Sequence, residues 1–498
     1  MKNYYMLVLL LITSLANAQQ ITLVKDINYY FLGEANFQSS PANLTAFNGK
    51  LYFSADDSQA TNTGGIDVGK ELWVSDGTPE GTVLVKDLDG SSDSSNPEHF
   101  FELNNKLYFQ AQDFAQNSYN FFTTDGTEAG TVSLGNNFQG GAPIVIGNKA
   151  YMRSFFLDAN NNFLGIYYEF DGTTFQALPD SGTGEVKAGS SYIALDNNSI
   201  LFNMTYTVAG TSVGQELYMY NITNQSYTLI KNFDDGPGDS NLYHFTKLGD
   251  DVYFEYDSDL WVTDGTTGGT TPIASASAIN DIGEIYAWGG KLYFEGDDGN
   301  NDQLWAYDPA TDKATSITDF AFRHDPVHFA APGDGYLYYA GKSQALSATF
   351  RLYRTDGVAI EPIEIDLIDN IDDIAVLNHK LYFEASFNTS NEDPTLGNVD
   401  IGRELFTYTN DELNTLDTSA FEFNNSISIY PNPSTSFVNI KTTLEGQINY
   451  SIYDLLGKQV LGGTMNNNII NYNLTSGLYL LKLDNGLQSI TKKIIVKN

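Results

Sequence analysis

The 498-residue chain contains no cysteine, and this absence excludes disulfides, thiolate metal ligands, cysteine nucleophiles and cysteine-linked lipid anchors. It is compatible with passage through an oxidising periplasm. Long apolar runs are also lacking, because the run Met6–Ile12 is too short to span a bilayer. Lys2 precedes this run and small residues follow it, which predicts a secretory signal peptide over residues 1–18. We expect cleavage after Ala16-Asn17-Ala18, with Gln19 as the first mature residue and no transmembrane segment in the mature chain.

Basic residues are scarce, since 25 lysines and arginines stand against 62 acidic residues for a net charge of −37. Residues 426–498 carry +3 and Lys2 adds +1, which leaves −41 on residues 19–425. Such a field repels nucleic acid and anionic glycans and favours cations or neutral ligands. We therefore expect no nucleic-acid partner, although solubility in a salty exterior also explains this charge.

A short cassette returns eight times: an Asn/Gly turn, a Lys-Leu-Tyr-Phe-like strand, a loop, and a Glu-Leu-Trp-like strand ending in Asp-Gly-Thr. The clearest copy runs from Asn48 to Asp87, and copies recur about every 47 residues. Four strand signals in this length are typical of a propeller blade. The pattern predicts an all-β chain with a β-propeller over residues 19–417, eight blades being favoured and seven the alternative. The third strand of each unit repeats an aromatic residue: Trp73, Phe122, Tyr168, Tyr218, Trp261, Trp305, Tyr353 and Phe406.

The segment Ile21–Asp26 copies the fourth-strand segment Thr82–Asp87. We expect it to pair with the last blade and so leave the ring without a free edge. In an up-and-down blade, the loops after the second and fourth strands share one face. These loops are long and varied, so this face is the predicted binding surface.

Several repeated positions are expected to be structural. An aspartate recurs at six equivalent turns after the aromatic strand, and we interpret it as a cap of the turn, because a catalytic site needs one special residue and not a ring of them. The residues with the clearest structural roles are Trp73, Asp76, Gly77, Trp261, Asp264, Gly265 and Trp305.

Acidic loops are candidates for calcium, which prefers several oxygen ligands on a flexible turn. The metal candidates are Asp87, Asp89, Asp93, Asp297, Asp298 and Asp302. None of these loops has the spacing of an EF-hand, and plain solvated turns are the alternative. His99, His244 and His328 each precede a phenylalanine in a first strand, but a ring would hold their blades apart, so repeat ancestry explains them better than a metal site.

After residues 418–425, which read as a linker, the pattern changes. Residues 426–498 contain about seven short strand signals, which predict a small immunoglobulin-like β-sandwich. This tail resembles the type A C-terminal sorting domain of the type IX secretion system. The residues that carry the resemblance are Tyr430, Pro431, Asn432, Pro433, Asp454, Gly457, Gly477, Tyr479, Lys492 and Lys493. The resemblance implies two partners, the type IX translocon and a C-terminal signal peptidase, and an extracellular or outer cell-surface location after periplasmic transit.

The repeat region resembles secreted proteins that carry the repeat Glu-Leu-Trp-x-x-Asp-Gly-Thr-x-x-Gly-Thr, a resemblance that implies no activity at particular residues. No catalytic motif stands out, and no catalytic residue is assigned. The favoured function is a non-catalytic binding or adhesion module for an extracellular glycan or protein. The alternative is a propeller enzyme, a glycoside hydrolase or lyase, that acts on neutral polysaccharide through carboxylates at the axis. A structural surface-layer component is a third hypothesis.

Overall fold

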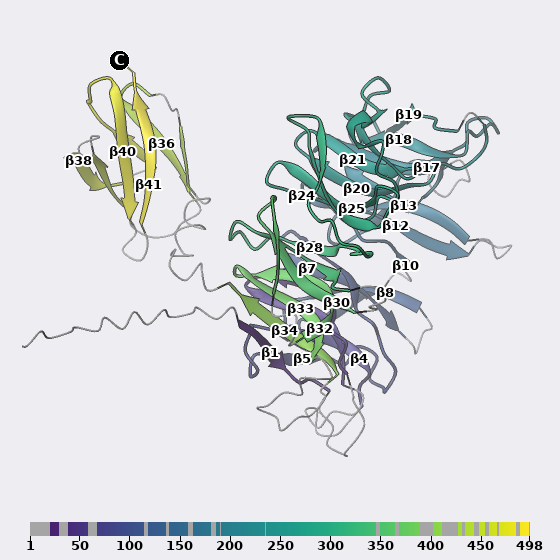
Figure 1. Ribbon diagram of the computed structural model, residues 1–498. Coiled ribbons are helices and arrows are strands. Elements are labelled where there is room, and N and C mark those ends of the chain that lie inside the picture. The colour runs from purple at the N-terminus through teal and green to yellow at the C-terminus, as the bar shows by residue number, and fades with distance from the viewer. Residues whose placement is uncertain are drawn as a thin grey trace, which may run out of the picture. The chain divides into compact units, whose positions relative to one another are not determined.

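The computed structural model describes residues 20–28, 38–57, 67–113, 118–135, 139–157, 163–180, 186–189, 191–234, 236–344, 349–363, 368–387, 402–410, 427–430, 434–442, 448–453, 458–465, 468–484 and 489–497 (Figure 1). The chain divides into two compact units, one of which is Gln19–Thr409, while the other contains Asn410–Asn498. The expected signal peptide with Ala16, Ala18 and Gln19 lies outside the described residues, as do the expected domain boundaries at residues 417 and 425.

Eight antiparallel sheets follow one another along the first unit, and we call them blades 1 to 8. This confirms the predicted propeller and its favoured blade number. Blade 1 contains β2 (Ala42–Phe47), β3 (Lys50–Asp56), β4 (Lys70–Ser75) and β5 (Val83–Lys86). Blade 2 contains β6 (Glu98–Leu103), β7 (Lys106–Asp113), β8 (Ser118–Thr124) and β9 (Val132–Gly135). Blade 3 contains β10 (Gln139–Gly140), β11 (Ile144–Ile146), β12 (Lys149–Leu157), β13 (Phe163–Phe170) and β14 (Phe175–Ala177). Blade 4 contains β15 (Val186–Lys187), β16 (Tyr192–Ala194), β17 (Ser199–Tyr206), β18 (Gln215–Asn221) and β19 (Ser226–Lys231).

The second half of the ring repeats the same order, with one short 3-10 turn, η1 (Ala274–Ala276). Blade 5 contains β20 (Leu242–Leu248), β21 (Asp251–Tyr256), β22 (Asp259–Thr263) and β23 (Thr271–Pro272). Blade 6 contains β24 (Ile285–Trp288), β25 (Lys291–Asp297), β26 (Asp302–Asp308) and β27 (Lys313–Ser316). Blade 7 contains β28 (Val327–Ala330), β29 (Leu337–Lys342), β30 (Phe350–Thr355) and β31 (Ile360–Pro362). Blade 8 contains β32 (Ile368–Leu377), β33 (Lys380–Phe387), β34 (Arg403–Thr409) and β1 (Gln20–Lys25).

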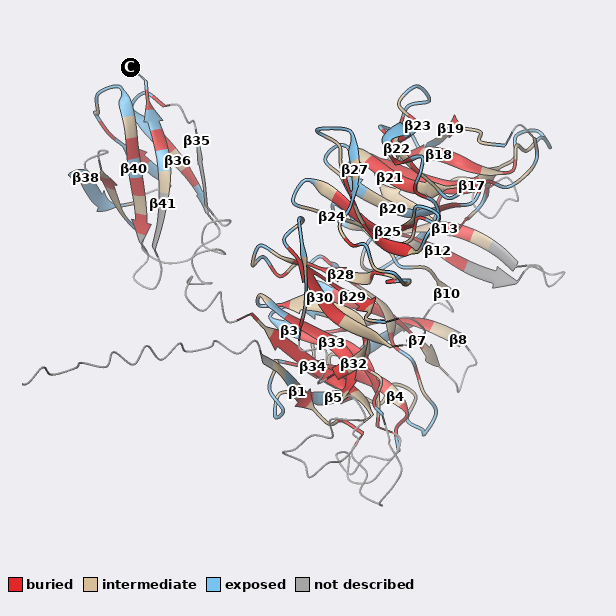
Figure 2. Ribbon diagram, viewed as in Figure 1, coloured by how far each residue is buried: buried red, intermediate tan, exposed pale blue. Residues whose placement is uncertain are grey.

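The N-terminal strand closes the ring. β1 pairs antiparallel with β34, from Gln20 opposite Thr409 to Lys25 opposite Leu405. The outermost strand of blade 8 therefore comes from the N-terminal part of the chain. Eight hydrophobic clusters each join two successive blades, and one of them joins blade 8 to blade 1. Figure 2 shows the buried residues concentrated on the middle strands of the blades. The alternating apolar strands thus pack on both faces, as the repeat pattern predicts.

The repeated turns also pack between blades. Gly77 has a φ of 91°, and a side chain at this position would clash with the hydroxyl of Tyr382 from blade 8. Gly126 of blade 2 meets Tyr52 of blade 1 in the same way. Glycine is therefore needed both for its backbone conformation and for this close approach.

The aspartate of each Asp-Gly-Thr turn accepts hydrogen bonds within its own turn. Asp76 Oδ1 accepts from the Thr78 amide at 2.9 Å and from the Thr78 hydroxyl at 2.7 Å, and these bonds lower its pKa. Gly81 N then donates to the Thr78 hydroxyl at 3.0 Å. Asp125 and Asp264 make the same bonds in blades 2 and 5. Such bonds hold the chain reversal after the third strand.

The tail forms a separate two-sheet sandwich. One sheet contains β35 (Ile427–Tyr430), β36 (Phe437–Thr442) and β39 (Ile469–Asn471), and the other β37 (Asn449–Tyr453), β38 (Gln459–Thr464), β40 (Gly477–Asp484) and β41 (Ser489–Val496). Its own core includes Val438, Ile452, Leu481 and Ile494. Within the described part of the chain, no helix has the length and apolar character needed to cross a membrane.

Candidate functional site

The first strands of five blades carry a β-bulge at one shared position, where the backbone φ is positive. Bulges of this kind redirect the side chain. The residues at this position are Asn43, His99, His244, His328 and Asp373. None of the metal-type groups found among the described residues contains a histidine.

Contacts at and beside the bulges join successive blades. Glu284 Oε2 accepts from the His328 amide at 2.8 Å, and His328 Nε2 lies 2.9 Å from Asp372 Oδ1. Asp373 Oδ2 accepts from the Leu44 amide of blade 1 at 2.9 Å. The hydrogen bond with Asp372 raises the pKa of His328. The carboxylates of Glu284, Asp372 and Asp373 therefore make contacts that join blade 6 to blade 7, blade 7 to blade 8, and blade 8 to blade 1.

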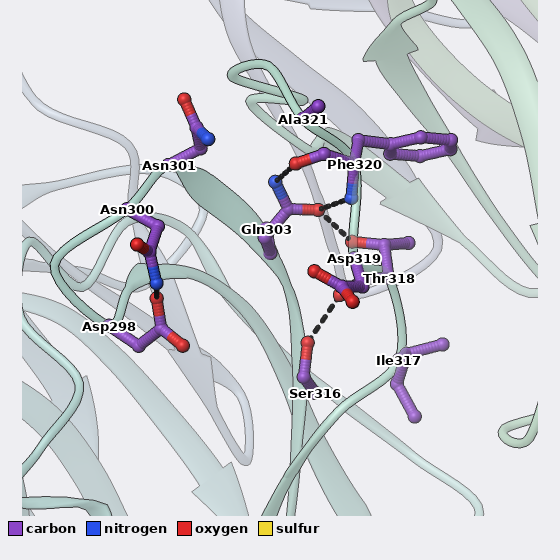
Figure 3. Close-up of a pocket in the computed structure, with 10 residues that line it drawn as sticks. All are labelled: Asp298, Asn300, Asn301, Gln303, Ser316, Ile317, Thr318, Asp319, Phe320 and Ala321. Carbon is purple, nitrogen blue, oxygen red and sulfur yellow. Dashed lines mark hydrogen bonds between the residues drawn. The ribbon is translucent and has the colours of Figure 1, made fainter.

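A polar pocket of about 630 Å³ opens in blade 6, on the face of the second-to-third and fourth-to-first loops. Figure 3 shows Asp298, Asn300 and Asn301 on one side and Ser316 and Asp319 on the other. Asp298 Oδ1 accepts from Asn300 Nδ2 at 2.8 Å. This size suits a small ligand, and the lining offers carboxylate, amide and hydroxyl groups.

Gln303 holds the second wall of this pocket. Its Oε1 accepts from the Thr318 hydroxyl at 2.7 Å and from the Phe320 amide at 3.0 Å. Its Nε2 donates to the carbonyl oxygens of Phe320, at 3.1 Å, and Phe322, at 3.0 Å. The ring of Phe320 stacks on Phe322 with a centroid distance of 4.9 Å. The wall is therefore fixed by a buried amide and two stacked rings.

A buried glutamate takes the position of Gln303 in three other blades, and its role was not predicted from the sequence. Glu71 Oε2 accepts from Leu88 N at 2.9 Å, and its Oε1 accepts from Ser95 N at 2.8 Å. Glu216 binds Phe233 N and the Ser240 hydroxyl, and Glu404 binds Ile27 N and Ser39, in the same manner. Each glutamate pins the loop that leads to the next blade. The recurrence of a serine 24 residues after Glu71 and Glu216 was the available signal.

In blade 1 this glutamate belongs to an acidic cluster. One carboxylate oxygen each from Glu71, Asp87 and Asp89 lies within 4.8 Å of the others. Burial raises the pKa of Glu71 to about 8 and also raises the pKa of Asp87. The structure thus brings two predicted metal candidates, Asp87 and Asp89, to one place, whereas the side chain of Asp93 is exposed and outside the cluster.

A second acidic cluster, in blades 6 and 7, contains Glu295, Asp302 and Asp325. Here Arg323 forms ion pairs with both Asp302 and Asp325, and Lys342 pairs with Asp325. Asp297 and Asp298 lie outside this cluster, and Asp297 accepts from Gly299 N at 2.7 Å. Two basic side chains therefore offset part of the negative charge around Asp302.

The other predicted residues lie as follows. Trp73 is buried, and Trp261 and Trp305 are half-buried. In the tail, Tyr430 is exposed, Gly477 begins β40, Tyr479 is buried, and Lys492 and Lys493 lie on β41. Pro431, Asn432, Pro433, Asp454 and Gly457 lie outside the described residues.

Residues 428–497 match the family model described as the secretion system C-terminal sorting domain. The match confirms the predicted sorting domain and supports export through the type IX pathway. A search of curated proteins found no match to the chain.

Solved structures with a similar fold include peptidases. Dipeptidyl peptidase 4 of Porphyromonas gingivalis is 9% identical, with 80% of this chain and 63% of that chain covered and a TM-score of 0.46. The β-propeller domain of the Trilobed protease from Pyrococcus furiosus is 11% identical, with 65% and 97% covered and a TM-score of 0.40. A puromycin hydrolase is 10% identical, with 74% and 61% covered and a TM-score of 0.42, so this chain spans about three fifths of its length. Such low identities and scores transfer no activity to the chain.

Proposed function

We propose that the chain is an exported, extracellular or surface-displayed protein whose propeller binds a neutral polar ligand, an oligosaccharide above all, without transforming it. The observation that carries this proposal is the pocket of blade 6. It lies on the predicted loop face, and Asp298, Asn300, Asn301, Ser316 and Asp319 line it with hydrogen-bonding groups. A hydroxyl-rich ligand can donate to the carboxylates and can accept from the amides.

The charge of the propeller narrows the ligand class. Residues 19–425 carry a net charge of −41, so an anionic glycan would meet long-range repulsion. A neutral glycan does not meet this repulsion. A protein ligand at the same face is the other outcome that a binding screen would reveal.

The rival proposal, an enzyme acting on neutral polysaccharide, rests on the carboxylates of the first strands. Glu284 and Asp373 accept backbone N–H groups of the following blades, and Asp372 contacts His328. These contacts favour a role in holding the ring together. The enzyme proposal predicts turnover of an oligosaccharide that a single change, Asp372→Asn, abolishes.

We further propose that the tail is of type A, that a signal peptidase removes residues 1–18, and that the tail is removed after translocation, with attachment to the surface or release. The terminal match at residues 428–497 supports this route. Mass spectrometry of the protein recovered from the culture surface and medium would give both mature termini. Intact residues 428–497 in the recovered protein would contradict removal of the tail.

The binding proposal is tested with the full chain on an array of neutral and anionic oligosaccharides. We expect saturable binding to a neutral glycan, no turnover, and at least a tenfold weaker affinity after Asn301→Ala or Asp319→Ala, since each removes a hydrogen-bonding group of the pocket. Asn224→Ala is the matched control, because Asn224 is an exposed asparagine in a turn of blade 4. Binding that survives both pocket changes, or product release that Asp372→Asn stops, would overturn the proposal.

A further inference from the structure

Asp57 is a further acidic residue of blade 1, on the same side of the sheet as Glu71 of the acidic cluster. It follows β3 directly, and the register places Ala55 opposite Glu71 and Asp56 opposite Lys70. Asp57 N donates to Gly69 O, which extends this ladder by one residue. Because side chains alternate along a strand, Asp57 and Glu71 point to the same side of blade 1 as diagonal neighbours. The negative charges of Asp56, Asp67 and Asp87 contribute, after burial, to the raised pKa of Asp57.

The carboxylate of Asp57 is fully buried and has no basic partner among the described residues, and the backbone N–H of Val68 is the donor that acts on it. The exposed fraction of Asp57 is 0%, and neither Oδ1 nor Oδ2 has a partner in full hydrogen-bond geometry. Asp89 Oδ2 is likewise buried and without a partner, while Asp89 Oδ1 accepts from Ser91 N at 2.8 Å. Burying an unpaired carboxylate is costly, so these oxygens favour either a positive partner or a proton.

No basic side chain supplies that charge. Among the ion pairs of the described residues, none involves Asp57, Glu71, Asp87 or Asp89. The cluster around Asp302 differs, because Arg323 and Lys342 pair with its acids. Among the described residues, one acidic cluster therefore has ion pairs with basic side chains and the other has none.

The fold of a blade does not require an acid at position 57. Blades 4 and 8 have the same buried glutamate, and their register places Tyr206 and Phe387 at the position of Asp57. Tyr206 packs on Tyr218, and Phe387 packs on Phe406, as edge-on aromatic pairs. Blade 1 has a buried carboxylate at the position where blades 4 and 8 have an aromatic side chain.

We propose that Asp57, Glu71, Asp87 and Asp89 form a calcium-binding site in blade 1, a feature that is independent of the ligand proposed for blade 6. Calcium takes six to eight oxygen ligands at about 2.3–2.6 Å, so two ligands on opposite sides of the ion lie about 4.6–5.2 Å apart. The oxygens of Glu71, Asp87 and Asp89 lie within 4.8 Å of one another, which matches this size. Hydrogen bonds from Ser91 N and Gly90 N already hold the two aspartates of the loop.

The test is calcium titration of the purified full chain, by calorimetry and by thermal unfolding with calcium or with chelator. We expect saturable binding, and a midpoint about 3 °C or more higher in calcium than in chelator, because the ion binds the folded state. Asp57→Asn and Asp89→Asn should each weaken calcium binding at least tenfold. Asp93→Asn removes the same charge from an exposed position of the same loop, so it should bind calcium like the wild type.

A second measurement separates a metal ligand from a merely structural residue. In chelator, Asp57→Asn should raise the unfolding midpoint, because it removes a buried carboxylate that has no basic partner. A structural hydrogen-bonding role predicts a lower midpoint in both calcium and chelator. Absence of calcium binding by the wild type, or equal binding by the wild type and both cluster variants, would overturn the proposal.

Discussion

At the scale of single residues, one position explains how the loops between blades are fixed. Glu71, Glu216 and Glu404 are fully buried, and each accepts hydrogen bonds from the loop that leads to the next blade. Gln303 fills the same position in blade 6 and binds its loop through both its oxygen and its nitrogen. A carboxylate and an amide thus both hold the loop between blades, which indicates that this position requires hydrogen bonding and not charge.

This position makes stability depend on pH in an unusual direction. Burial raises the pKa of Glu216 above its ordinary value of 4.5, and it raises that of Glu71 to about 8. The protonated form therefore favours the folded state, and its contribution is full below pH 4.5 and lost as the pH rises through the folded pKa. In chelator, we expect the unfolding free energy to increase as the pH falls from about 8 to about 5.

Glu216→Gln should remove part of this increase, by about 1.4 kcal/mol for each pKa unit of the shift. The amide can accept from Phe233 N and donate to the Ser240 hydroxyl, so the folded state keeps both contacts. Urea unfolding at several pH values measures the change, and Glu102→Gln at an exposed position is the control. An unchanged pH profile in Glu216→Gln would show that Glu216 does not titrate in this range.

At the scale of elements, the sequence predicted the blades well because each strand carries its own alternating pattern and each turn its own Asn/Gly or Asp-Gly-Thr signal. The same reasoning predicted the closing strand, since Ile21–Asp26 copies Thr82–Asp87. It could not assemble the acidic cluster, because Glu71 on β4 meets Asp87 and Asp89 only through the loop that returns to it. Asp93, which the spacing had grouped with Asp87, turns out to be exposed.

The closing strand has a testable energetic role. Val24 of β1 is buried in the cluster that joins blade 8 to blade 1. Val24→Asp would bury an unpaired charge there, so we expect a loss of about 3 kcal/mol or more in unfolding free energy. Thr22→Asp on the same strand is exposed and should change it by about 0.5 kcal/mol or less. Denaturant unfolding measures both, and equal effects would contradict a closing role for the buried face of β1.

At the scale of the whole molecule, the strongly acidic residues 19–425 contrast with residues 426–498, which carry a net charge of +3. The acidic propeller has a closed ring of hydrophobic clusters, and the weakly basic tail has a core of its own around Ile452 and Leu481. Because each unit buries its own apolar residues, neither needs the other's core to fold. Separate stability would allow the proposed removal of the sorting domain to leave the propeller intact.

Deletion of residues 428–498 tests this division of roles. The truncated propeller should unfold at a midpoint within about 2 °C of the propeller transition of the full chain, because its own clusters remain complete. In a bacterium with a type IX system, the same truncation should remain in the periplasm, since the matched sorting domain is gone. Fusion of residues 427–498 to an unrelated periplasmic protein should carry that protein to the cell surface or the medium. Export of the truncated chain at the wild-type level would show that the propeller itself is recognised by the export machinery.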